Sequence, residues 1–126
     1  MTVPNNRPNF EIVLSESTTS IATTPVAMIF AVPTSGYIQR GIAVSAGTTT
    51  GTTTFAATVN GGSDIFAGAL TIAAGAGNLN NPSVALPLTG ASAVLVSEGD
   101  IITVTPSGGT GASIQGAVSL VIRPAG

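Results

Sequence analysis

Residues that exchange protons near neutral pH are scarce in this chain of 126 residues. Histidine and cysteine are both absent, so catalytic arrangements built on imidazole or thiolate cannot form. The closest pair of carboxylates is Glu98 and Asp100. Glycosidases set such pairs in a cleft that aromatic side chains usually line, but the chain has no tryptophan and one tyrosine. We therefore predict no enzymatic activity and interpret this segment as a turn in which Asp100 caps backbone amides.

The acidic residues offer one other kind of site, which is a calcium site. Calcium takes carboxylate and carbonyl oxygens, and Asp64, Glu98 and Asp100 are candidate ligands, although their spacing matches no EF-hand loop. The glycine-rich segments Gly75–Gly77 and Gly108–Gly111 lack the Lys-Ser/Thr pair of a phosphate-binding loop. We predict ordinary loops at both places, and neither a cofactor nor a metal ion.

Positive charge is confined to Arg7, Arg40 and Arg123, because the chain has no lysine, and five acids give a net charge of -2. A nucleic-acid-binding surface needs a basic stripe that displaces counterions from phosphates, and none can be built here. The same shortage argues against binding to an anionic membrane. Nucleic acid and membrane are therefore not expected partners.

Arg40 is the charge whose position is unusual, because in a regular strand it shares a face with Ile38, Ile42 and Val44. One explanation is a β-bulge at Gly41 that turns Arg40 outward. The other is a buried Arg40 that pairs with a carboxylate, for example from a neighbouring subunit.

Strands are the elements that must position these residues. Thr, Val and Ile dominate the apolar segments, and 16 glycines and 8 prolines interrupt any long helix. Short runs at intervals of about ten residues predict an all-β, single-domain antiparallel β-sandwich, jelly-roll-like, with about eight strands. The predicted strands are 10–14, 26–32, 37–46, 55–59, 64–73, 84–88, 93–96, 101–105 and 112–123.

Local patterns add detail to four of these strands. Val26 to Val32 is apolar almost throughout, which predicts burial on both faces. Asn60-Gly61-Gly62 predicts a tight hairpin turn, because Asn and Gly accept positive φ angles, with the return strand over 64–73. Ile102 and Val104 alternate with threonines, and Val118, Leu120 and Ile122 are expected to point inward in the last strand. Residues 106–111 are predicted to be a flexible loop.

Charged residues make up only 6% of the chain, against about 25% in a typical soluble domain. Two interpretations follow: a monomer covered with Thr, Ser and Asn, or a protein whose surface is largely covered in an assembly. The N-terminus lacks the basic and apolar regions of a signal peptide, and no uncharged stretch is long enough to span a membrane without Gly or Pro. Synthesis in a cytoplasm is the expectation.

Residues 1–9 are predicted to form an extended arm ahead of a sandwich domain over residues 10–126. Pro4 and Pro8 pre-extend the arm and lower the entropic cost of ordering it on a partner. The candidate partner-binding residues are Val3, Pro4, Arg7 and Pro8 in the arm, together with Arg40. The alternative for the arm is a disordered terminus.

Several short motifs occur in an order that resembles a known group of proteins. They are Pro33–Ile38, Val59–Gly62, Leu86–Leu88, Glu98–Val104 and Ser119–Arg123. Together they resemble the small jelly-roll proteins of tailed-phage virions, which are capsid decoration (cement) proteins and head-fibre domains, and are more distantly similar to the trimeric C1q/TNF-like jelly roll.

The resemblance implies a function. It implies a virion protein on the capsid surface that binds the major capsid protein and stabilises the lattice, as a homotrimer. An alternative is a receptor- or glycan-binding domain at a fibre or spike tip. Such a domain needs an aromatic platform, for which the candidates are Phe10, Phe30, Tyr37, Phe55 and Phe66.

Overall fold

The computed structural model describes residues 11–74, 83–87 and 94–124. All regular secondary structure in these ranges is β-strand. The residues of the predicted arm, and Phe10, lie outside the described ranges. The strands are β1 (Ile12–Thr18), β2 (Met28–Ala31), β3 (Gly36–Ser45), β4 (Thr53–Val59), β5 (Thr71–Ile72), β6 (Ser83–Ala85), β7 (Leu95–Val96), β8 (Ile101–Ser107) and β9 (Gly116–Pro124).

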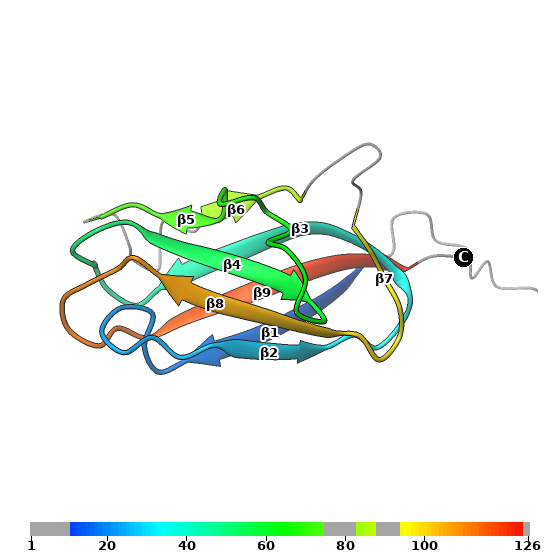
Figure 1. Ribbon diagram of the computed structural model, residues 1–126, viewed down its shortest axis with the longest axis horizontal. Helices are drawn as coiled ribbons and strands as arrows, with labels where there is room; N and C mark the ends of the chain where they lie inside the picture. The colour runs from blue at the N-terminus through cyan, green and yellow to red at the C-terminus, as the bar shows by residue number, and fades with distance from the viewer. Residues whose placement is uncertain (1–10, 75–82, 88–93, 125–126) are drawn as a thin grey trace, which may run out of the picture.

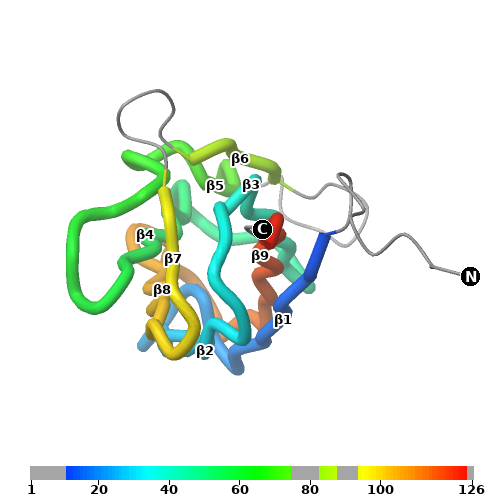
Figure 2. Tube along the Cα trace, turned by 90° about the vertical axis from the view of Figure 1, so that its right-hand side faces the viewer, coloured from blue at the N-terminus to red at the C-terminus, as the bar shows by residue number. Residues whose placement is uncertain are grey.

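Two antiparallel sheets pack face to face (Figure 1). Sheet A has the order β1-β9-β3-β6, with β7 also paired to β3, and sheet B has the order β2-β8-β4-β5. Figure 2 looks along the strands and shows β3, β9 and β1 on one side and β4, β8 and β2 on the other. Since β6 and β7 pair with different stretches of β3, they share one strand position. The resulting eight positions have the arrangement of a jelly roll, which confirms the predicted fold class.

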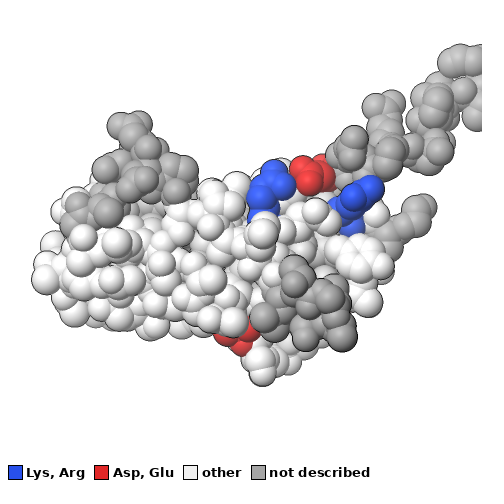
Figure 3. All heavy atoms as spheres, turned by 90° about the horizontal axis from the view of Figure 1, so that it is seen from above, with Lys and Arg blue, Asp and Glu red and all other residues white. Residues whose placement is uncertain are grey.

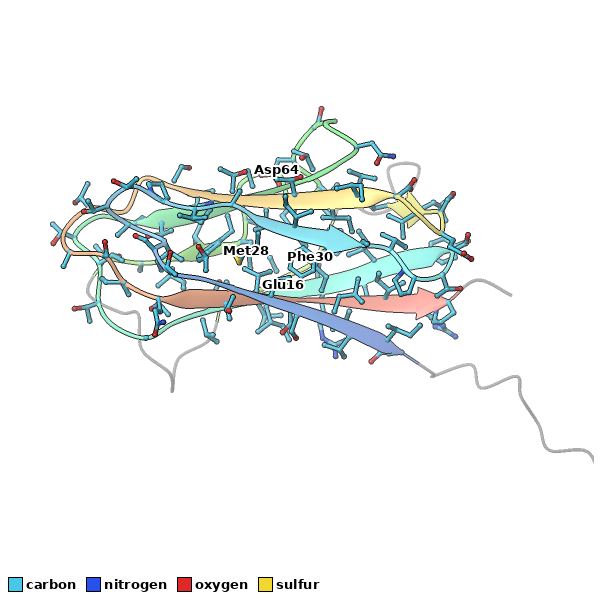
Figure 4. All side chains as sticks on the ribbon, turned by 90° about the horizontal axis from the view of Figure 1, so that it is seen from below. Glu16, Met28, Phe30 and Asp64 are labelled. Carbon is cyan, nitrogen blue, oxygen red and sulfur yellow. The ribbon has the colours of Figure 1, made fainter. Side chains whose placement is uncertain are left out.

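The core lies between the sheets and follows the alternation of the strands. Ile102 and Val104 of β8 face Val118, Leu120 and Ile122 of β9, and all five are fully buried. Each such side chain stabilises the fold by roughly 1.5–3 kcal/mol relative to an exposed one. Figure 4 shows Met28 and Phe30 of β2 directed into the same space. The inward residues predicted for β8 and β9 are therefore confirmed.

The prediction that Val26 to Val32 is buried on both faces is wrong. Met28 and Phe30 are buried, but Ile29 between them is 62% exposed. The reason is that β2 is the edge strand of sheet B, and within the described ranges no further strand packs on the outer face of that sheet. A nearly continuous apolar run here marks a half-buried strand rather than a central one.

The hairpin turn at Asn60-Gly61 is confirmed, but the predicted return strand over 64–73 is wrong. Asn60 and Gly61 both have positive φ angles, 51° and 80°, and the Gly62 amide donates to the Val59 carbonyl. The chain then runs back along β4 irregularly, and only Thr71–Ile72 forms a strand. A turn at residues 65–68, held by Asp64, replaces the regular ladder.

The segment 106–111, predicted to be a flexible loop, is fixed in place. Pro106 and Ser107 belong to β8, and Thr110 exchanges two backbone hydrogen bonds with Thr50, of 3.0 and 2.9 Å. The predicted first and last strands are also shifted, because β1 runs on to Thr18 and β9 begins at Gly116.

Candidate functional site

Asp100 and Glu98 lie in the turn that joins β7 to β8. The Ser97 amide donates to Asp100 Oδ2 at 2.9 Å, and Asn60 Nδ2 donates to Asp100 Oδ1 at 3.1 Å. These two hydrogen bonds, with the Ser97 amide first, lower the pKa of the Asp100 carboxyl below its ordinary value. Asn60 Oδ1 in turn accepts from the Ile101 amide at 2.9 Å. Asp100 thus ties its own turn to the Asn60 hairpin, as the predicted capping role requires.

Asp64 performs a similar structural task beside β4. Its Oδ1 accepts from the amides of Ala57 and Phe66 at 3.1 and 3.0 Å, and its Oδ2 accepts from the Gly68 amide at 2.9 Å. In the described ranges no three acidic side chains gather into a metal-binding cluster. The structure therefore does not bring Asp64, Glu98 and Asp100 together as calcium ligands.

Arg40 lies on a β-bulge, as the first of its two explanations predicted. The register of β3 against β9 shifts between Ile38 and Arg40, so that Arg40 pairs with Val121 and Gly41 with Leu120. Gly41 therefore takes the position in β3 that points into the core. Because glycine has no Cβ, the Phe66 ring fits beside it. The buried alternative is wrong, because the Arg40 side chain is 38% exposed.

The partner of Arg40 comes from the same chain. Its Nη1 lies 3.5 Å from Oε2 of Glu11, whose side chain is 34% exposed. Glu11 is the first described residue of the chain, so Arg40 lies beside the point where the predicted arm joins the domain. The other candidate partner-binding residues, Val3, Pro4, Arg7 and Pro8, lie outside the described residues.

The outer face of sheet A carries exposed apolar side chains. The described residues include eight large hydrophobic side chains that are exposed, and five of them lie on this face or directly after β6 at its edge, between 43% and 67% exposed. Exposed apolar side chains that gather on one face are candidates for a contact surface. The five residues are Val13, Tyr37, Val84, Leu86 and Leu95.

The outer face of sheet B is different, because hydroxyl groups dominate it. The outward residues of β4 and β8 include Thr54, Thr58, Thr103, Thr105 and Ser107, which neighbour one another in the register. Figure 3 shows how few charged side chains the molecule presents in one view, with wide uncharged areas between them. The two broad faces are therefore both uncharged over most of their area but differ in polarity.

The aromatic platform that a glycan-binding tip needs is not assembled. Phe30, Phe55 and Phe66 are all buried in the core. Tyr37 is the one aromatic side chain exposed within the described ranges, at 43%, and Phe10 lies outside them.

Sequence reasoning missed the apolar outer face of sheet A. A signal was present, since β1 reads Ile12-Val13-Leu14 and β3 reads Ile42-Ala43-Val44. Consecutive residues of a strand point to opposite faces, so a strand in which all of them are apolar is expected to be covered on both faces. Reading that signal required knowing that β1, β9 and β3 are neighbours.

Comparison with known proteins leaves the family open, since no family model matches the chain and no curated protein does either. The described residues contain no helix with the length and hydrophobicity to cross a membrane.

Proposed function

We propose that this chain is a non-enzymatic structural protein of a tailed-phage virion, which binds the major capsid protein at the head surface and stabilises the lattice. The resemblance of its motifs to small jelly-roll decoration proteins supports this function. So does the state of its carboxylates, because Asp64 and Asp100 are engaged by backbone amides. What remains for recognition is uncharged surface and the few exposed charges.

The observation that carries the proposal is the contact between Arg40 and Glu11. It places Arg40 beside Glu11, which follows the predicted arm over residues 1–9 closely in sequence. An exposed ion pair of this kind contributes only about 0.2–1 kcal/mol to folding. Arg40 is therefore free to exchange Glu11 for a carboxylate of the capsid subunit while the arm lies along that subunit.

The test uses the purified full chain and expanded empty heads of the phage whose genome encodes it. The full chain is expected to sediment with the heads. Deletion of residues 2–9 is expected to abolish sedimentation, and Arg40→Gln to weaken it by about tenfold, which is about 1.4 kcal/mol. Arg123→Gln is the matched control, because Arg123 is the neighbouring exposed arginine on the same face of sheet A, where it pairs with Tyr37.

Each result decides a separate part of the proposal. Undiminished binding of the deletion variant refutes the arm as an anchor, and equal losses for Arg40→Gln and Arg123→Gln refute a specific role for Arg40. Absence of binding by the full chain, together with binding to glycans or host cells, refutes the decoration function and favours the fibre tip.

A further inference from the structure

The hairpin turn after β4 contains the one Asn-Gly pair of the chain, Asn60-Gly61. Asparagine loses its side-chain amide spontaneously when the backbone nitrogen of the next residue attacks the amide carbon. Glycine favours this reaction, because it places no side chain beside the attacking nitrogen and leaves the backbone free to rotate. Asn60 is therefore the asparagine of this sequence with the least hindered route to deamidation.

The attacking nitrogen, which belongs to Gly61, is accessible. Asn60, Gly61 and Gly62 are all exposed. The amides of Asn60 and Gly62 donate to the carbonyls of Ile101 and Val59, but within the described ranges the Gly61 amide donates to no acceptor. Solvent base can therefore remove the Gly61 proton without breaking a hydrogen bond of the turn.

The side chain that must be attacked is held by two hydrogen bonds, which we call the Asn60 clamp. Asn60 Nδ2 donates to Asp100 Oδ1 at 3.1 Å, and Asn60 Oδ1 accepts from the Ile101 amide at 2.9 Å. Because both polar atoms are engaged, the side-chain amide has to leave these partners before it can rotate towards Gly61. Loss of one such hydrogen bond shifts an equilibrium by roughly tenfold. The clamp therefore opposes the reaction.

We propose that Asn60 is a modification site of this chain, which deamidates to aspartate and isoaspartate at a rate that the Asn60 clamp sets. The exposed turn supplies the reactive pair, and Asp100 with the Ile101 amide supplies the restraint. This assignment does not depend on the proposed function, because neither Asn60 nor Asp100 belongs to the candidate partner-binding residues.

The reaction balances with water as its co-reactant. The Gly61 nitrogen loses its proton and forms a bond to Asn60 Cγ, and the bond from Cγ to Nδ2 breaks, so that the side-chain nitrogen leaves as ammonia. Water then opens the resulting cyclic imide. Addition at Cγ gives aspartate with an ordinary backbone, whereas addition at the main-chain carbonyl carbon gives isoaspartate, in which the backbone passes through the side chain. No atom is oxidised or reduced.

Deamidation would weaken the link between the hairpin and the turn before β8. Aspartate has an oxygen in place of the Nδ2 donor, which in Asn60 lies 3.1 Å from Asp100 Oδ1. Two carboxylates at this separation repel each other, whereas the Ile101 amide still finds an acceptor. The modification therefore turns the attraction between residue 60 and Asp100 into a repulsion.

Peptide mass spectrometry of the full chain, incubated in mildly alkaline buffer, measures the reaction. The peptide that contains Asn60 is expected to gain the mass difference between an amide and an acid. Asp100→Ala removes one bond of the clamp and is expected to raise the rate by about tenfold, and Asp100→Asn, which keeps an acceptor oxygen, by less. Glu98→Ala is the matched control, because Glu98 is an exposed acid in the same turn. The chain unfolded in urea gives the rate without the clamp.

Circular dichroism establishes that each variant is folded before its rate is compared. An Asn60 that stays intact in the folded chain and in Asp100→Ala, while the unfolded chain reacts, overturns the assignment of the site. Equal rates for the unmodified chain, Asp100→Ala and Glu98→Ala contradict the role of the clamp.

The structural consequence is tested with Asn60→Asp, which is one of the two products. Hydrogen exchange of the amides of residues 60 and 101 is expected to be about tenfold faster than in the unmodified chain, because the repulsion favours local opening. Ser63→Asp is the matched control, since it adds the same charge at an exposed residue of the same hairpin. Unchanged exchange in Asn60→Asp, or the same acceleration in both variants, would refute a specific contact with Asp100.

Discussion

Replacement of Gly41 by alanine tests the bulge that turns Arg40 outward. A Cβ at Gly41 would lie 2.6 Å from Cζ and 3.0 Å from Cε2 of Phe66, and 3.3 Å from Cδ2 of Leu70. Carbon atoms pack best at about 3.5–4.0 Å, so the Phe66 ring must retreat by about 1 Å. Since Phe66 and Leu70 are both fully buried, the ring has no free space to enter.

The magnitude follows from two opposing effects. Overpacking of a well-filled core costs typically 1–3 kcal/mol. Loss of glycine from the unfolded chain returns about 0.4–1 kcal/mol. Gly41→Ala is therefore expected to lower the free energy of unfolding by about 1–2 kcal/mol, which corresponds to roughly 3–10 °C in Tm for a domain of this size.

Urea unfolding of Gly41→Ala beside Gly47→Ala is the assay. An added Cβ at Gly47 meets its nearest neighbour, Ile114 Cγ2, at an ordinary 3.7 Å, so that variant is expected to be neutral or stabilised by up to about 1 kcal/mol. Phe66→Leu should relieve the crowding, so the double variant is expected to show a coupling of about 1 kcal/mol. Equal stability of Gly41→Ala and Gly47→Ala would refute the packing of Phe66 against the bulge.

Three further predictions concern single polar groups. Thr53→Val is expected to be neutral or to stabilise by about 1 kcal/mol in thermal unfolding, because the buried Thr53 Oγ1 has no hydrogen-bond partner among the described residues; a loss above 1 kcal/mol would contradict this. Asp64→Ala is expected to cost roughly 2–3 kcal/mol, because three backbone amides lose their acceptor, whereas the exposed Glu98→Ala should change little. The lowered pKa of Asp100 means that its stabilising effect is present above 3.8 and is lost as the pH falls through the lower folded value. Unfolding of Asp100→Asn across this acid range should accordingly vary less with pH than unfolding of the unmodified chain, and identical pH profiles would contradict the assignment.

Local patterns predicted those parts of the fold that depend on neighbours in sequence. The alternation of Ile102 and Val104 assigns the inward face of β8, and Asn60-Gly61 specifies the hairpin by its positive φ angles. Gly41 beside Arg40 indicated a bulge at this point of the strand, and the register of β3 shifts between Ile38 and Arg40. Each of these signals lies within a few residues of the feature that it predicts.

Features that depend on distant pairing were not predictable from the sequence. Arg40 meets Glu11, which is 29 residues away, and Ser15 meets Ser119, which is 104 residues away. The regular strand expected over 64–73 failed because the Asp64 side chain competes with the backbone for the Ala57 amide.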